Sequence, residues 1–216
     1  MKKFLEFLSQ LARRLRPLFK HPPKMAVKRE ENPRPTCGAG RIGIAISSGH
    51  GLMVPGAVGM LDEVREARRV VKRVAEILRE MGVTAHEFHD DESATAAGNI
   101  AAIVGWHNSQ ERDLDVSVHF NAFRPTGGPM GAEVLYLTAG EAAAKVSKAI
   151  SEAGGLRDRG ARRRADLGFL SRAGKPAILL EVCFVDSAWD AQLYGENFDA
   201  ICLAIADALR DCPKGT

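Results

Sequence analysis

The sequence lacks several features that mark particular classes of protein. Its four cysteines are scattered without a CxxC pair, which argues against a disulfide framework and against a zinc ribbon. No stretch approaches the ~18 consecutive apolar residues that a membrane-spanning helix needs. There is no low-complexity tract and no helix-turn-helix or base-stacking signature. These absences favour an ordinary globular domain.

The net charge of +3 is unevenly distributed along the 216 residues. Residues 1–40 contain ten Lys or Arg and three Asp or Glu, a net charge of +7, so residues 41–216 carry −4. The basic character therefore belongs to the N-terminal segment. The acidic remainder argues against a nucleic-acid partner.

Residues 1–20 place apolar side chains at helical spacing among basic ones, which predicts a basic amphipathic helix. Charges interrupt its apolar stretch and no small-residue cleavage site follows, so it is not a convincing signal peptide. The helix either lies on an anionic membrane surface or packs on its own domain or a partner. Residues 21–40, rich in proline and charge, predict a linker, and residues 212–216 form a short tail.

From residue 41 to residue 211, short apolar runs alternate with helical patterns, which predicts a single catalytic domain. The expected strands are 42–46, 84–88, 115–119, 132–137 and 177–184, and the expected helices are 62–81, 95–110, 141–153 and 198–209. This alternation predicts an α/β fold with a mostly parallel twisted sheet covered by helices on both faces. Functional residues should then lie at the ends of the strands.

Two histidines follow predicted strands. His50 comes after the first strand, between two glycines that permit a tight turn, and His119 ends the strand DVSVH. Catalytic Zn²⁺ sites take three protein ligands from His, Cys, Asp and Glu. Each histidine alone also fits a plain loop residue or a hydrogen-bonded core group. Of the others, His86, His89 and His107 are poorer candidates for a metal ligand.

A carboxylate at the start of the helix predicted from residue 62 is a natural third ligand, and Asp62, Glu63 and Glu66 compete for this role. Ion pairs with neighbouring arginines explain Glu66 without a metal. Glu63 is favoured, because it lies immediately before the apolar stripe of the helix.

Glu181 places a charge inside the apolar run AILLEVCFV. A buried carboxylate needs either a structural partner such as an arginine or a functional reason to be there. With two candidate ligand histidines at other strand ends, a general base beside a metal is the favoured interpretation.

Four motifs in this order, SSGHG, an acid that opens a helix, VSVHFNA and PAILLEVCFVDS, resemble the zinc-dependent N-acetylmuramoyl-L-alanine amidases. This group includes bacterial cell-separation amidases and phage endolysins. The resemblance covers residues 41–209 and implies that His50, Glu63 and His119 bind Zn²⁺ and that Glu181 is the catalytic acid and base. It implies hydrolysis of the amide between N-acetylmuramic acid and L-alanine of the peptidoglycan stem peptide.

The resemblance extends to Asn121 and to the segment at Arg159, whereas Phe120, Cys183 and the basic run 162–164 depart from the common pattern. These departures concern the shape of the substrate groove. The scattered cysteines, interpreted as free thiols, fit synthesis in a reducing cytoplasm, and the resemblance implies action at the cell wall. Two rivals are a zinc peptidase that acts on the stem peptide and a non-catalytic wall-binding module, and the intact set of four residues disfavours the second.

Overall fold

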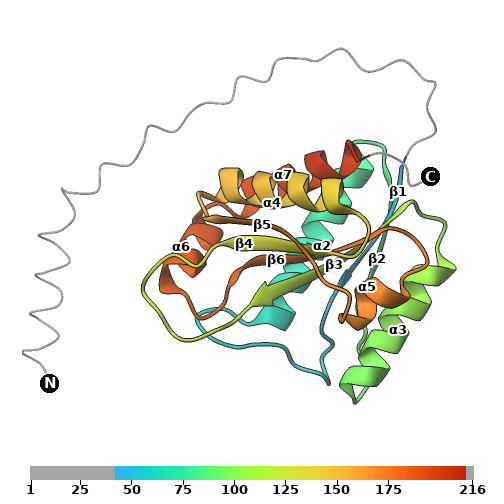
Figure 1. Ribbon diagram of the computed structural model, residues 1–216, viewed down its shortest axis with the longest axis horizontal. Coiled ribbons are helices and arrows are strands. Elements are labelled where there is room, and N and C mark those ends of the chain that lie inside the picture. Colours follow the sequence, from blue (N-terminus) through green and yellow to red (C-terminus); the bar gives the residue numbers. More distant parts are fainter. Residues whose placement is uncertain (1–41, 213–216) are drawn as a thin grey trace, which may run out of the picture. The chain divides into compact units, whose positions relative to one another are not determined.

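The computed structural model describes residues 42–212, where a six-stranded sheet has helices against both faces (Figure 1). In chain order the elements are β1 (Gly43–Ser48), α2 (Glu63–Glu80), β2 (Thr84–Phe88), α3 (Ala96–Ser109), β3 (Leu114–Asn121), β4 (Ala132–Tyr136), α4 (Gly140–Gly154), β5 (Asp158–Arg163), α5 (Gly168–Arg172), β6 (Ala177–Phe184), α6 (Ala188–Glu196) and α7 (Phe198–Arg210). The α/β fold expected from the sequence is confirmed. Apolar periodicity alone does not predict β5, α5 and α6.

The strands lie in the order β2-β1-β3-β6-β4-β5. Neighbours run parallel except β4 and β6, which pair antiparallel. The register sets His119 on β3 beside Glu181 on β6, and Glu181 beside Glu133 on β4. Three polar residues from three strands are therefore neighbours across the sheet.

Alternation along β3 divides its side chains between two helical layers. Val116 and Val118 belong to a large buried cluster with α2, α4 and α7. Ser117 and His119 occupy the alternate positions and so face the other side of the sheet. There a smaller cluster contains Ile103 of α3 and Phe169 of α5. The polar row thus lies on the face with fewer covering helices.

Helix α2 begins where the sequence predicts. The side chain of Asp62 accepts a hydrogen bond from the backbone N–H of Arg65 at 2.9 Å and caps the helix. The apolar stripe behind it is fully buried, and it consists of Ala67, Val70, Val71, Val74 and Leu78. Because this stripe fixes the helix against the sheet, the first turn is held at a fixed place beside the strand ends.

The predicted amphipathic helix at 1–20 and linker at 21–40 lie outside the described residues and stay predictions, as does most of the tail. Within residues 42–212, none of the helices is both long and apolar enough to cross a membrane.

Asp190 in α6 is a fully buried carboxylate that joins separate segments. It accepts hydrogen bonds from the backbone N–H groups of Met130 (3.0 Å), Gly131 (2.8 Å) and Phe184 (3.2 Å). The loop that follows β3 is thereby held against the end of β6.

We expect Asp190→Ala to lower the free energy of unfolding by about 3 kcal/mol, because three buried N–H groups lose their acceptor. Urea denaturation followed by circular dichroism measures the change. Asp199→Ala is the matched control, since Asp199 is an exposed α7 residue that pairs with Arg73 at the surface and should matter little. Equal effects of the two substitutions would contradict the role of Asp190.

Candidate metal centre

His50 lies two residues beyond the end of β1, in a turn held by three hydrogen bonds. The N–H of Gly49 donates to the carbonyl of Val118 at 2.9 Å, and the side-chain amide of Asn99 donates to the carbonyl of Gly49 at 2.8 Å. The hydroxyl of Ser48 donates to the carbonyl of His50 at 3.2 Å. The turn is thus fixed from β3, from α3 and from its own strand.

Two glycines leave room for the side chains of this site. A Cβ at Gly49 would lie 1.7 Å from Nε2 of His119, and a Cβ at Gly56 would lie 2.3 Å from Oε2 of Glu63. Both distances are far below van der Waals contact. Glycine is therefore required at each position if the histidine and the carboxylate are to keep their places.

Glu63 is the first residue of α2 and is 4% exposed. Oε2 accepts the N–H of Ala57 at 2.7 Å, and Oε1 accepts the N–H of Phe120 at 3.1 Å. Burial alone raises the pKa of Glu63, but the hydrogen bond from His119 and the charges of both histidines outweigh it, so the pKa is lowered. The group is therefore held as a carboxylate.

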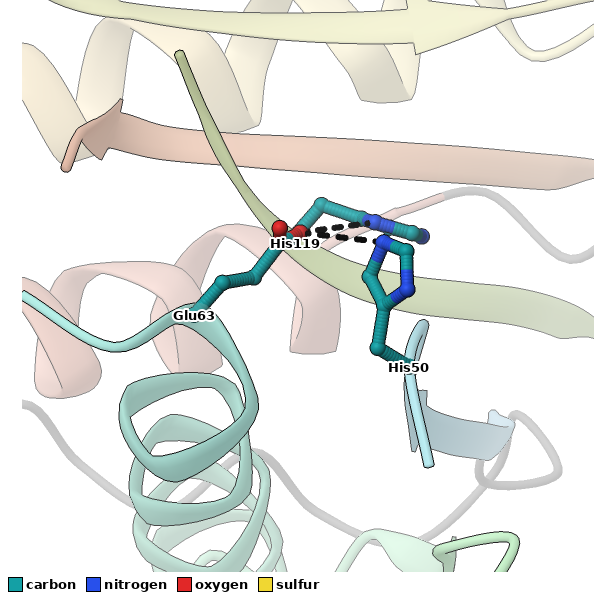
Figure 2. Close-up of side chains that lie close together, drawn as sticks. All are labelled: His50, Glu63 and His119. Carbon is teal, nitrogen blue, oxygen red and sulfur yellow. Dashed lines mark hydrogen bonds and ion pairs between the residues drawn. The ribbon is translucent and has the colours of Figure 1, made fainter. Parts of the chain in front are cut away.

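The three side chains that the sequence predicts as metal ligands meet at one point (Figure 2). Oε1 of Glu63 lies 3.1 Å from Nδ1 of His119 and 3.5 Å from Nε2 of His50. The imidazole rings are 5.1 Å apart and nearly perpendicular, at 80°. One donor atom from each residue lies within 4.8 Å of the other two. This is a donor set of two nitrogens and one oxygen.

The other two acids at the start of α2 lie elsewhere. Asp62 caps the helix, and Glu66, 1% exposed, pairs with Arg65 and Arg69. The hydroxyl of Tyr194 also donates to Glu66 at 3.1 Å. Glu66 thus has the ion pairs that the neighbouring arginines in the sequence predict. Its hydrogen bond from Tyr194 could not be predicted from those neighbours.

The two histidines have opposite pKa shifts. Burial lowers the pKa of His50, and Glu63 offsets this only in part. Burial also lowers the pKa of His119, but its hydrogen bond to Glu63 and the charge of Glu181 outweigh burial, so the pKa is raised. Glu63 and Glu181 therefore both raise the pKa of His119, which lies between them.

Glu181 lies next to His119 across the sheet. Its Oε2 atom is buried and has no hydrogen-bond partner among the described residues. Burial is the main reason that the pKa of Glu181 is raised to about 7; His119 lowers it, and Glu63 and Glu133 raise it further. A carboxyl group with this pKa can both accept and donate a proton near neutral pH.

The sequence reasoning did not single out Glu133, which is 6% exposed beside Glu181. Asn121 donates to its Oε1 at 2.9 Å, and Arg162 and Arg159 approach its Oε2 at 2.9 Å and 3.3 Å. The signal that identified Glu181, a charge in an apolar strand, is also present at Glu133. Glu133 thus differs from Glu181, because two arginines pair with its carboxyl group whereas Oε2 of Glu181 has no partner among the described residues.

Comparison with known proteins identifies the family. A family model described as N-acetylmuramoyl-L-alanine amidase matches residues 44–211. The chain belongs to the N-acetylmuramoyl-L-alanine amidase family. An uncharacterised protein of Clostridium perfringens strain 13 is 28% identical over 176 residues, which make up 78% of this chain and 51% of that protein. The chain thus spans about half the length of the curated relatives that it matches.

Solved structures of amidases have the same fold. The N-acetylmuramoyl-L-alanine amidase AmiC2 of Nostoc punctiforme is 27% identical, with a TM-score of 0.64 over 80% of this chain and 97% of that one. The catalytic domain of the CD27L endolysin, which targets Clostridia difficile, is 22% identical, with a TM-score of 0.72 over 78% and 96% of the two chains. At this identity the second likeness concerns the fold alone.

Beneath the turn of this amidase-family chain, a hydrogen-bonded row runs through the sheet. Ser47 contacts Nε2 of His107 at 2.9 Å, Nδ1 of His107 contacts Asp115 at 2.8 Å, and Arg112 donates to both oxygens of Asp115. The order Ser, His, Asp is that of a serine hydrolase triad. All three are fully buried, however, so substrate has no access and the row serves to fix α3 against the sheet.

Burial raises the pKa of Asp115, but hydrogen bonds from His107 and Arg112 outweigh it, so the folded-state pKa is lowered. Its stabilisation is therefore present above the unfolded pKa of about 3.9 and is lost as the pH falls through the lower folded value. We expect Asp115→Asn to cost about 3–5 kcal/mol at pH 7. Urea denaturation between pH 5 and pH 3 should show a flatter pH dependence for the variant, and parallel curves would refute this assignment.

We expect stoichiometric Zn²⁺ to raise the melting temperature of the wild type, and His119→Ala to abolish this shift because one of three donors is lost. Affinity should fall as the pH is lowered, since imidazoles must be deprotonated to bind a metal, and the fall should begin with His119, whose pKa is raised. Calorimetry and thermal melts measure both effects. His86→Ala is the control, because His86 lies in β2 outside the cluster; unchanged Zn²⁺ binding by His119→Ala would exclude the site.

Proposed function

We propose that this chain is a zinc-dependent peptidoglycan hydrolase that cleaves the amide between the lactyl group of N-acetylmuramic acid and L-alanine of the stem peptide. The observation that carries the proposal is the convergence of His50, Glu63 and His119, with Glu181 one strand away. Membership of the amidase family supports the class of bond. The action at the cell wall follows from the substrate.

The donor set fits Zn²⁺. Two imidazole nitrogens and one carboxylate oxygen are a common arrangement in catalytic zinc sites, which leave a further position for water or substrate. The second oxygen of Glu63 is held by the N–H of Ala57, so Oε1 alone is directed at the histidines. When bound, Zn²⁺ lowers the pKa of a water molecule and polarises the amide carbonyl. Glu63, His50 and His119 would hold the ion.

Glu181 carries the proton transfers in this proposal. Its buried Oε2 has no other partner among the described residues and is free to accept a proton from the attacking water. Because its pKa is raised to about 7, the same group can pass that proton to the leaving amine of L-alanine. One carboxyl group thus serves first as base and then as acid.

Glu133 has a separate, positioning role. It is hydrogen-bonded to Asn121 and paired with Arg159 and Arg162, which fixes its position beside Glu181. Its charge helps to raise the pKa of Glu181. Glu133 thereby helps Glu181 to hold a proton that it must later deliver.

We expect Glu181→Gln to lower kcat on purified sacculi by about 10²–10⁴-fold, because proton transfer is lost while the three donor residues remain. Mass spectrometry of the products should find stem peptides with a free L-alanine N-terminus for the wild type only. Zn²⁺ binding should be retained by the variant.

Glu152→Gln on the exposed face of α4 is the matched control and should leave hydrolysis unchanged. Cleavage within the stem peptide would replace the amidase assignment by a zinc peptidase. Absence of any cleavage that is sensitive to a chelator would overturn the proposed activity.

A further inference from the structure

A hollow of about 140 Å³ opens beside the metal centre, on the face of the sheet that α3 and α5 cover. His119 and Leu179 belong to its sheet wall, and Ile100, Ile103 and Phe169 belong to its helical walls. Its volume is several times the roughly 10–15 Å³ that one water molecule needs. The mostly apolar lining favours a small apolar group of a ligand over water.

Asn99 also lines the hollow and is 2% exposed. Its side-chain Nδ2 donates to the carbonyl of Gly49, which determines the orientation of the amide. The other atom, Oδ1, is buried and has no hydrogen-bond partner among residues 42–212. A Cβ on Gly51, a residue outside the lining of the hollow, would lie 3.1 Å from this atom, so Oδ1 is directed toward the Gly51 backbone. The hollow therefore offers a ligand apolar contacts, and a small apolar group fits it best.

The opposite side of Glu181 is charged. Glu181 stands on β6, and the next strands, β4 and β5, bring Glu133, Arg159 and Arg162. The side chain of Arg162 is 56% exposed, so it can contact an anionic ligand in addition to its partner Glu133. An apolar hollow and an arginine-bearing strand thus flank the candidate catalytic carboxyl group on its two sides.

This asymmetry matches the two halves of the proposed substrate. The stem peptide has carboxylates, which would pair with the arginines of β5. Its N-terminal amine is the leaving group that Glu181 protonates in the proposed reaction. The acyl half is an uncharged sugar that carries an acetamido group. An acetamido group ends in one methyl, which is the kind of small apolar group that the hollow accepts.

We propose that the hollow is a subsite for the acetamido group of the muramoyl residue, with its methyl against Ile100, Ile103 and Phe169. The glycan then lies toward α3 and α5, and the stem peptide lies toward β5. The inference rests on the proposed amidase function and adds the direction in which the substrate binds.

Filling the hollow tests the subsite. Ala96 lines it from the exposed first turn of α3, so Ala96→Leu should reduce its volume without loss of the fold. Ala97→Leu is the matched control, because Ala97 is the next exposed residue and lies outside the lining. The substrates are N-acetylmuramoyl-L-alanyl-D-isoglutamine, its N-formyl analogue without the methyl group, and its analogue with glycine in place of L-alanine.

The wild type should prefer the N-acetyl compound to the N-formyl compound by about 10-fold in kcat/KM, as expected for one methyl group in an apolar pocket. Ala96→Leu should lower kcat/KM for the N-acetyl compound by about 10–100-fold and abolish this preference, whereas Ala97→Leu should keep both. Calorimetry should find that N-acetylmuramic acid, the acyl product, binds more weakly to Ala96→Leu than to the wild type or Ala97→Leu.

Three outcomes would overturn the subsite: no preference for N-acetyl in the wild type, equal effects of Ala96→Leu and Ala97→Leu, or loss at Ala96→Leu of discrimination between L-alanine and glycine instead. The last would place the amine half in the hollow. If the wild type cleaves none of the compounds but binds N-acetylmuramic acid in a manner that depends on residue 96, the hydrolase proposal fails and the subsite stands.

Discussion

The carboxylate of Glu63 joins the first turn of α2 to the end of β3, and the geometry of the site depends on it. One oxygen accepts the N–H of Phe120 and contacts Nδ1 of His119, while the other accepts the N–H of Ala57. The helix behind it is fixed by a buried apolar stripe, so the carboxylate has a rigid support. Two imidazoles that approach from separate strand ends therefore meet the same oxygen atom. A centre built on rigid elements in this way is held ready for its ligand.

The reversed direction of β4 gives the site a third carboxyl group, after those of Glu63 and Glu181. In a wholly parallel sheet, only the last residues of the strands gather at the carboxyl edge. Because β4 runs antiparallel to β6, its beginning lies at that edge, and Glu133, the second residue of β4, stands beside Glu181. The bulge between β4 and β5 then shifts the register next to the arginine-bearing strand. The antiparallel strand β4 thus places Glu133, together with the arginines that pair with it, beside Glu181.

Much of this arrangement follows from the sequence, because its strongest elements have clear patterns. The apolar stripe of α2 and the glycines around His50 predict both the helix and the turn, and the charge at Glu181 stands out in an apolar strand. Glu133 also interrupts an apolar strand, but it lies at the beginning of that strand, and the rule of strand ends selects such a position only when the strand is known to be antiparallel. β5 was missed because its sequence DRGARR has no apolar alternation. The hollow depends on the packing of α3 against α5, and no local pattern near Asn99 encodes it.

The arginines of β5 have a second consequence, which concerns association of the folded chain. β5 is the last strand of the sheet within the described residues, and an edge strand offers unpaired backbone groups to other chains. Arg159, Arg162 and Arg163 place positive charge along this strand, so two copies that met edge to edge would bring like charges together. Gly160, with a φ of 78°, further interrupts the regular edge. The arginines that we propose to face the stem peptide thus also oppose edge-to-edge pairing of two copies, and neutral substitutions of them would reduce the colloidal stability of the domain.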